Sequence, residues 1–139
     1  MNKSILLIGC KGQVGTQLKK ALQPYNNLIA VARPEVELVQ PETIKNLIKH
    51  WEPQIIINAA AYTAVDKAEN EPELANKINA VAPRVLAEEA NKSQALLIHI
   101  STDYVFDGKS NRPYQENDLT NPLSIYGETK LAGEQAISS

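Results

Sequence analysis

Short apolar runs alternate along the chain with segments in which apolar residues recur at every third or fourth position. The first run, residues 4–8, reads Ser-Ile-Leu-Leu-Ile and is almost continuously apolar, which is typical of a parallel strand buried on both faces. Three further runs of this kind occupy residues 28–32, 54–58 and 95–100. The pattern predicts a sheet of about four parallel strands.

Helical periodicity fills the segments between these runs. Val14, Leu18 and Leu22 recur every fourth residue and form one face of a first helix, which Pro24 ends. A second helix begins at Pro41. Its apolar stripe consists of Ile44, Leu47, Ile48 and Trp51.

A longer helix is predicted from Pro72. Its inward-facing residues are Leu74, Ile78, Val81, Val85 and Leu86. Pro83 interrupts the pattern and either bends this helix or begins a fresh one at its first turn. After a polar loop over residues 108–121, a last helix is predicted from residue 122 or 123 to the end of the sequence.

The order β-α-β-α-β-α-β-α predicts an α/β fold, a Rossmann-like doubly wound parallel sheet with helices on both faces and right-handed crossovers. Ligands of such sheets bind beyond the carboxyl ends of the strands. The most distinctive segments of the chain follow the first, third and fourth runs, at residues 9–15, 59–66 and 101–108. We therefore expect a binding site at this edge.

Length and composition narrow the class of protein. The chain has 139 residues, of which 43% are hydrophobic and 22% charged, so one globular domain without a disulfide or metal staple is expected. The net charge of −2 predicts no nucleic-acid or anionic lipid partner. One cysteine, Cys10, excludes an intramolecular disulfide. Without a signal-peptide pattern or an apolar run near the ~20 residues that span a bilayer, a cytoplasmic location is expected.

Three of the six glycines stand within the segment that directly follows the first run. Gly9 permits a tight turn, Gly12 the close approach of a pyrophosphate to the backbone, and Gly15 the packing of helix on strand. The alternative is a plain strand-to-helix turn, because the spacing Gly-x2-Gly-x2-Gly is a weak signal by itself. Cys10 and Lys11 are interpreted as loop fillers.

The end of the second run bears on the choice of dinucleotide. NAD sites usually have an acidic residue there for the ribose hydroxyls, whereas this chain has Arg33. A guanidinium suits the 2′-phosphate of NADP, which favours NADPH. A solvated loop charge is the alternative, and the nearby Glu35 and Glu37 leave NADH open.

Tyr126 and Lys130 stand four residues apart on the last predicted helix, so they share one helix face. A nearby ammonium favours the phenolate and lowers the pKa of a phenol, and such a tyrosine can donate a proton to a carbonyl oxygen as hydride reaches the carbon. Thr102, after the fourth run, could hydrogen-bond the same oxygen, or bond local backbone instead. An ordinary helix surface is the alternative for the Tyr-x3-Lys pair.

Together these motifs resemble the extended short-chain dehydrogenase/reductases and, within them, the N-terminal half of the dTDP-4-dehydrorhamnose reductase family. The resemblance runs through essentially the whole chain. The matching segments are GCKGQVG (9–15), NAAAYTAVDKAE (58–69), STDYVFDG (101–108) and YGETKLAGE (126–134).

The resemblance implies a site for NADPH or NADH. The pyrophosphate loop corresponds to Gly12, Gln13 and Val14, beside Gly9 and Gly15. Glu37 and Leu38 match an Asp-Leu-type pair near the adenine. Small residues that let the cofactor lie along the third strand correspond to Ala59, Ala60 and Ala61.

The resemblance also implies catalytic and substrate-binding residues. Tyr126 matches the proton donor, Lys130 its partner that also touches the cofactor, and Thr102 and Asp103 the pair that contacts a dTDP-sugar. Asn79 matches a helix asparagine for which a backbone-bracing role is expected. His50 and His99 are assigned nothing. Some members bind Mg2+ through carboxylates at a dimer interface, but Gln17 stands where a Glu is expected, so no metal site is predicted.

Family members are about twice as long, so residues 1–139 are interpreted as the NAD(P)-binding Rossmann domain of a protein whose C-terminal substrate-binding part is absent from this chain. The fourth strand would then expose an edge that normally pairs. We expect that edge to be covered by a second copy, as in a homodimer, by a swapped segment, or by the other half.

The resemblance implies reduction of dTDP-4-dehydro-β-L-rhamnose to dTDP-L-rhamnose, with this part supplying cofactor binding and the Thr/Tyr/Lys residues. One alternative is a non-catalytic, nucleotide-binding regulatory homologue, which would have no reason to keep Thr102, Tyr126 and Lys130. Another is a nucleotide-sugar epimerase or dehydratase of the same superfamily. The segments VDKAE (65–69) and STDYVFDG favour the reductase.

Overall fold

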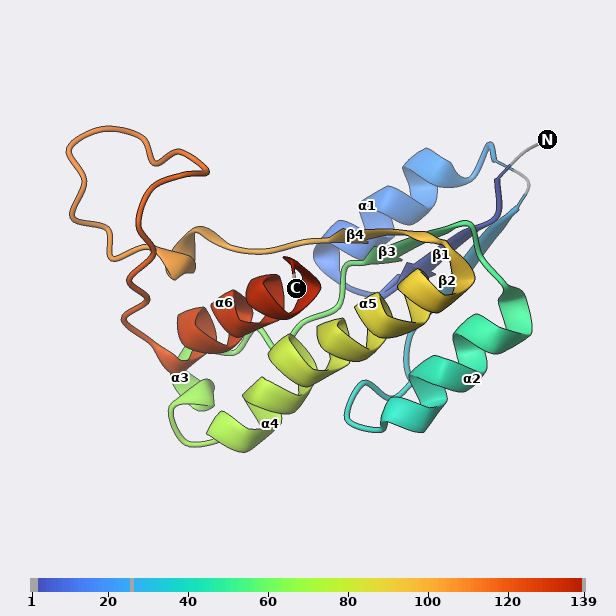
Figure 1. The fold of residues 1–139 in the computed structure, drawn as a ribbon, viewed down its shortest axis with the longest axis horizontal. Helices are drawn as coiled ribbons and strands as arrows, with labels where there is room; N and C mark the ends of the chain where they lie inside the picture. The colour runs from blue at the N-terminus through green and yellow to red at the C-terminus, as the bar shows by residue number, and fades with distance from the viewer. Residues whose placement is uncertain (1–2, 26, 139) are drawn as a thin grey trace.

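The computed structural model, which describes residues 3–25 and 27–138, contains the predicted parallel sheet. The four strands lie in the order β2-β1-β3-β4 (Figure 1). Their bounds are β1 Ile5–Ile8, β2 Leu28–Val31, β3 Ile55–Asn58 and β4 Leu96–His99. The central strand β1 is buried along its whole length, as its continuous apolar sequence requires.

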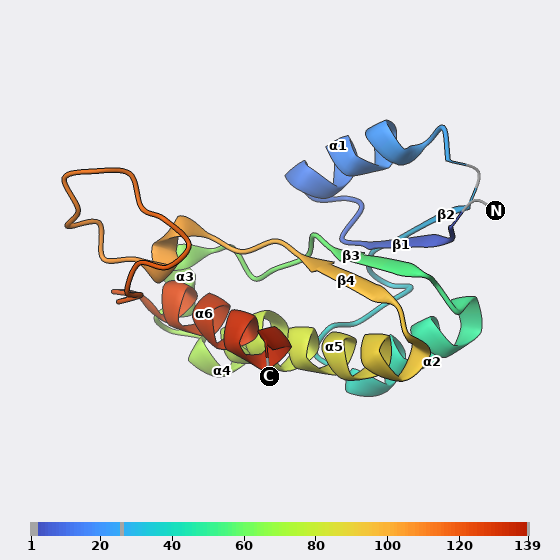
Figure 2. The same cartoon turned by 45° about the horizontal axis from the view of Figure 1, so that its top comes forward.

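Helices cover both faces of the sheet, as predicted (Figure 2). On one face, α1 (Gln13–Leu22) supplies Leu18 and Leu22 to a core with β1 and β3. On the other face lie α2 (Pro41–Trp51) and α5 (Ala82–Ser93), which pack on the larger core. The chain therefore forms the Rossmann-like α/β layers that the alternation of elements predicts.

The long helical segment from Pro72 is made of three pieces. These are α4 (Pro72–Asn76), a π-helical turn η1 (Lys77–Val81) and α5. Pro83 is buried and directly follows the π-turn, and the helical backbone continues through Val81 and Ala82 without a break, so no fresh helix begins there. A π-turn directs an extra residue inward, and such turns are frequent at functional sites.

Three apolar residues predicted to face the core are exposed, and these predictions were wrong. Val14, 48% exposed, lies in the first turn of α1, which begins past the carboxyl end of β1 and has no strand beneath it. Trp51 ends α2 at the opposite edge of the sheet, where its ring packs edge-on against His50. Leu74 lies on α4, beyond the sheet (Figure 1).

The segments at the carboxyl edge contain short elements that hydrophobic periodicity does not predict. These are α3 (Val65–Ala68) and a 3-10 turn η2 (Asp103–Val105). The last helix, α6 (Ile125–Ser138), begins two or three residues later than predicted. The loop before it is irregular as expected and is ordered around Asp107, whose carboxylate accepts hydrogen bonds from Lys109 N, Tyr114 and Asn121. These bonds hold the pKa of Asp107 below its usual value.

The strand β4 forms one edge of the sheet, as predicted. Its side chains alternate between exposed and half-buried, and Leu96, 59% exposed, lies with Ile98 and Ile100 on the open face. This face is apolar although no described helix covers it (Figure 2).

Candidate functional site

The glycine segment makes a tight turn between β1 and α1. Gly9 has φ of +88°, in the left-handed region, and a Cβ there would lie 2.8 Å from Ala60 N. A Cβ at Gly15 would overlap the carbonyl oxygen of Gly9, so this glycine lets α1 pack on the turn. At Gly12 the nearest atom to a Cβ would be Gly9 O, 3.4 Å away, which leaves the position open on its outer side.

The N-terminus of α1 is suited to a phosphate. Gly12 is the N-cap, and within the described residues no side chain caps the helix and no acid lies in its first turn. The amide N–H groups of the first turn are therefore free to bind an anion, which the helix dipole also favours. The exposed Val14 lies at the same end. The residues present thus fit a dinucleotide pyrophosphate across Gly12, Gln13 and Val14.

Two cations gather at the end of β2. Arg33 is exposed just beyond this strand, and the ammonium of Lys11 donates to the carbonyl oxygen of Arg33 at 3.0 Å. Lys11 was interpreted as a loop filler, so its place beside Arg33 is a finding of the structure. Close by, Thr43 Oγ1 accepts from Glu37 N and donates to Glu37 O, which fixes the Glu37–Leu38 segment. This cluster can hold a phosphate on the adenosine ribose.

A buried asparagine orders the end of β3. Asn58 is fully buried, and its Oδ1 accepts from Ala60 N at 3.2 Å. Its Nδ2 lies 3.0 Å from His99 Nδ1 on the neighbouring strand. Asn58 thereby shapes the backbone of Ala59, Ala60 and Ala61, which are half-buried and line the predicted cofactor path.

His99 is held neutral beneath the site. Because Asn58 Nδ2 donates, His99 Nδ1 accepts and the ring proton lies on Nε2. Burial, reinforced by the charge of Lys130, lowers the pKa of His99 to about 4. Its Nε2 is buried and has no hydrogen-bond partner among the described residues. The sequence offered no motif for His99, and Asn58 stood only as the first residue of the matching segment 58–69, with no role assigned.

The predicted pair Tyr126 and Lys130 lies on the first turns of α6. Lys130 is only 2% exposed, and its ammonium donates to Ile100 O, at the end of β4, at 2.6 Å. Burial lowers the pKa of Lys130, and the charge of Glu134 opposes that shift. The ring of Tyr126 packs edge-on against Tyr104, with ring centroids 5.6 Å apart. The structure thus places both side chains against the segment that follows β4.

Thr102 caps the short turn η2. Its Oγ1 accepts from Tyr104 N at 3.2 Å, which is the local backbone bond considered as an alternative role. The same hydroxyl donates to Asp103 Oδ1 at 3.4 Å, which is long compared with the usual distance of about 2.7–2.8 Å between two oxygens, so these contacts orient Thr102 and engage its donor only weakly. Asp103 is exposed beside it.

Asn79, in the π-turn, braces the backbone as expected. Its Oδ1 accepts from Tyr62 N at 2.8 Å, and its Nδ2 donates to Tyr62 O and to Thr129 Oγ1, each at 3.1 Å. Gly133 lets α6 approach the carbonyl of Asn79, where a Cβ would overlap. Asn79 therefore ties the segment after β3 to the helix that carries Tyr126 and Lys130.

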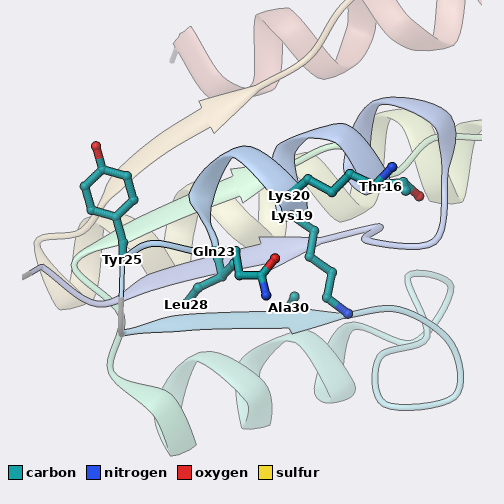
Figure 3. A pocket seen from close by; sticks show the side chains of 7 residues that line it. All are labelled: Thr16, Lys19, Lys20, Gln23, Tyr25, Leu28 and Ala30. Atoms are coloured by element: carbon teal, nitrogen blue, oxygen red, sulfur yellow. The ribbon is translucent and has the colours of Figure 1, made fainter.

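Other parts of the surface do not join this site. A shallow groove between α1 and β2 contains none of the predicted site residues (Figure 3). Its lining residues are Thr16, Lys19, Lys20, Gln23, Tyr25, Leu28 and Ala30.

Residues 3–25 and 27–138 contain no group of three or more His, Cys, Asp or Glu residues that could hold a metal ion. Within the same ranges no helix is long and apolar enough to cross a bilayer.

Comparison with known proteins agrees with this geometry. Residues 2–139 match the family described as RmlD substrate binding domain. The chain belongs to this family. Among its relatives, dTDP-4-dehydrorhamnose reductase of Salmonella typhimurium is 47% identical over 138 residues, which cover 96% of this chain and 46% of the relative. The enzyme of the same name from Escherichia coli K12 is 49% identical over the same shares of the two chains.

Solved structures show the same fold. The dTDP-4-dehydrorhamnose reductase of Clostridium acetobutylicum is 40% identical with a TM-score of 0.94, over 97% of this chain and 49% of that one. The reductase of Bacillus anthracis, solved in complex with NADP, is 36% identical with a TM-score of 0.95, over 99% and 50%. The resemblance inferred from the motifs is confirmed, and the chain spans about half the length of these relatives.

Proposed function

We propose that the chain is the NADPH-binding part of a dTDP-4-dehydrorhamnose reductase, which reduces dTDP-4-dehydro-β-L-rhamnose to dTDP-L-rhamnose. The observation that carries the proposal is the uncapped N-terminus of α1 at the same sheet edge as Thr102, Tyr126 and Lys130. The reductase relatives, one of them solved with NADP, support both the reaction and the cofactor.

The mechanism assigns one task to each residue. When bound, NADPH would supply the hydride for reduction of the C4 carbonyl of the sugar. Tyr126 donates its phenolic proton to the carbonyl oxygen, so the ketone becomes a secondary alcohol. Thr102 donates a hydrogen bond to the same oxygen and stabilises the charge that develops there. Lys130, held by Ile100 O, keeps two further N–H donors for the cofactor ribose and for Tyr126.

The direct test is reduction of the 4-keto sugar nucleotide, followed by the loss of reduced-nicotinamide absorbance, with the polypeptide that joins this chain to the second half. Cofactor binding by residues 1–139 is measured separately, from nicotinamide fluorescence. The proposal expects both binding and reduction. Binding without reduction would instead favour a nucleotide-binding regulatory homologue, and an epimerised or dehydrated product would favour another enzyme of the superfamily.

Removing the cations at the end of β2 should change the cofactor preference. Replacing Arg33 and Lys11 together by alanine is expected to weaken NADPH binding about tenfold or more and to leave NADH binding within about twofold, because only NADPH has a 2′-phosphate. Lys49→Ala, an exposed lysine in the last turn of α2 at the opposite edge of the sheet, is the matched control. Equal losses for the two cofactors would contradict this assignment.

We also propose that the open edge of β4 pairs with another strand, from the second half, from a swapped segment or from a second copy. The exposed apolar face of Leu96, Ile98 and Ile100 supports this. Sedimentation of residues 1–139 alone is expected to show self-association, and Ile98→Lys should abolish it. When the second half is supplied and covers the face, no self-association is expected. Two results together would contradict this proposal: residues 1–139 stay monomeric at every concentration, and the β4 amides exchange freely with solvent even when the second half is present.

A further inference from the structure

The helix α6 is tied by hydrogen bonds to two residues of the chain between β3 and α5, Glu69 after α3 and Asn79 in η1. Near its start, Glu69 Oε1 accepts a hydrogen bond from Ile125 N at 2.9 Å, across 56 positions of sequence. One turn further on, Thr129 accepts from Asn79 at 3.1 Å. Ile125 directly precedes Tyr126, and Thr129 directly precedes Lys130. Each anchor is thus one residue from a proposed catalytic side chain.

The hydrogen bond from Ile125 N to Glu69 gives a partner to a backbone N–H that has no acceptor within the helix. The first N–H groups of a helix have no partner within it. In α6, Ser124 Oγ accepts from Gly127 N at 3.1 Å, and Glu69 supplies the acceptor for Ile125 N. A carboxylate at this position is also favoured by the helix dipole. The first turn of α6, including Tyr126, is therefore fixed from outside the helix.

Glu69 is itself attached to a well-anchored segment. It ends the short helix α3, whose Ala68 is fully buried. Beyond it, Glu71 N donates to Ala68 O at 3.1 Å, and the Glu71 carboxylate accepts from the Tyr62 hydroxyl at 2.5 Å. The motif VDKAE, which contains Glu69, had no role assigned from sequence beyond family likeness. Its last residue now has a defined contact.

The other contacts of Tyr126 do not replace this one. The ring meets Tyr104 edge-on, and Gly127 allows α6 to approach the carbonyl of Tyr104. Both contacts are made to η2, and neither provides an acceptor for the first N–H of the helix. Without Glu69, Ser124 would still cap the first turn through Gly127 N, but Ile125 N would lose its acceptor.

We infer that Glu69 is a positioning residue for Tyr126: its carboxylate caps α6 and sets where the phenol stands. The role in reduction rests on the proposed function. The hydrogen bond from Ile125 N to Glu69 and its effect on the position of Tyr126 do not depend on the proposed function. The positioning of Tyr126 and the role in reduction can therefore be tested separately.

The first test uses residues 1–139 with isotope-labelled tyrosine. In Glu69→Ala the Ile125 amide is expected to exchange with solvent about tenfold faster, and the Tyr126 ring resonance to shift or broaden. Glu69→Gln keeps an acceptor oxygen, so it should restore both signals. Glu73→Ala is the matched control, because this exposed acid makes no side-chain hydrogen bond or ion pair with the described residues. Unchanged Ile125 exchange and Tyr126 resonance in Glu69→Ala would overturn the inference.

The second test measures turnover in the complete reductase. Glu69→Ala is expected to lower kcat about tenfold while KM for NADPH stays within about twofold, because Lys130 and the glycine turn keep their own anchors. Glu69→Gln should recover most of kcat. A merely structural role would lower the melting temperature and leave kcat of the folded fraction unchanged, and that result would overturn the positioning role. If the unaltered enzyme reduces no keto sugar, the proposed function fails, and the exchange and resonance data still decide whether Glu69 places Tyr126.

Discussion

Replacing Tyr126 with phenylalanine is expected to lower the turnover of the complete reductase by about a hundredfold to ten-thousandfold, the range that general acid catalysis contributes. The substitution removes the phenolic proton and keeps the ring that packs against Tyr104. NADPH binding should stay within about twofold, because the glycine turn and Lys130 are unchanged. Steady-state kinetics and a fluorescence titration of the same variant measure the two quantities.

Tyr104→Phe is the matched control for this prediction. Tyr104 is exposed, and its aromatic contact with Tyr126 survives the change. Turnover of this control should stay within a few-fold of the unaltered enzyme. A Tyr126→Phe enzyme as active as the control would show that another group delivers the proton.

Two alanine substitutions in the glycine turn should separate cofactor binding from folding. Gly12→Ala is expected to fold with a nearly unchanged melting temperature, since its Cβ would meet only Gly9 O at 3.4 Å. The same Cβ occupies the space that a pyrophosphate needs, so NADPH affinity should fall about tenfold to a hundredfold. Thermal unfolding and nicotinamide fluorescence on the same samples report both effects.

Gly15→Ala should show the opposite pattern. Its Cβ would overlap the Gly9 carbonyl, which is backbone and cannot rotate away. We expect a loss of about 2–3 kcal/mol or more in the free energy of unfolding, and a lower melting temperature. If Gly12→Ala bound NADPH as well as the unaltered chain, the pyrophosphate would have to lie elsewhere.

The layers of this fold could be predicted because its signals are local. A strand buried on both faces must be apolar throughout, which residues 4–8 display without any knowledge of their neighbours. The spacing of Gly9, Gly12 and Gly15 is also a local signal, because one tight turn requires it. Tyr126 and Lys130 could be identified for the same reason, since four residues of one helix separate them.

Contacts between distant segments could not be predicted in this way. Asn58 meets His99 across 41 positions, and Glu69 meets Ile125 across 56. Both pairs depend on strand order and helix placement, which periodicity does not encode. Lys11 was missed because its partner is the backbone carbonyl of Arg33, and backbone groups leave no trace in a sequence pattern.

The exposed apolar residues show the same limit. Periodicity predicted that Val14 and Leu74 face the core, which was wrong, because the pattern cannot tell where the sheet beneath a helix ends. Val14 lies past that end, at the predicted cofactor loop, where its exposure suits a bound dinucleotide.

The central claim is that a dinucleotide lies across the glycine turn with its reactive ring beside Tyr126 and Lys130. Titrating isotope-labelled chain with NADPH and following its amide and tyrosine resonances tests this most directly. The account predicts saturable shifts at Gly12, Gln13 and Val14 together with Tyr126. Shifts confined to the groove at Lys19 and Tyr25, with the glycine amides unmoved, would contradict it.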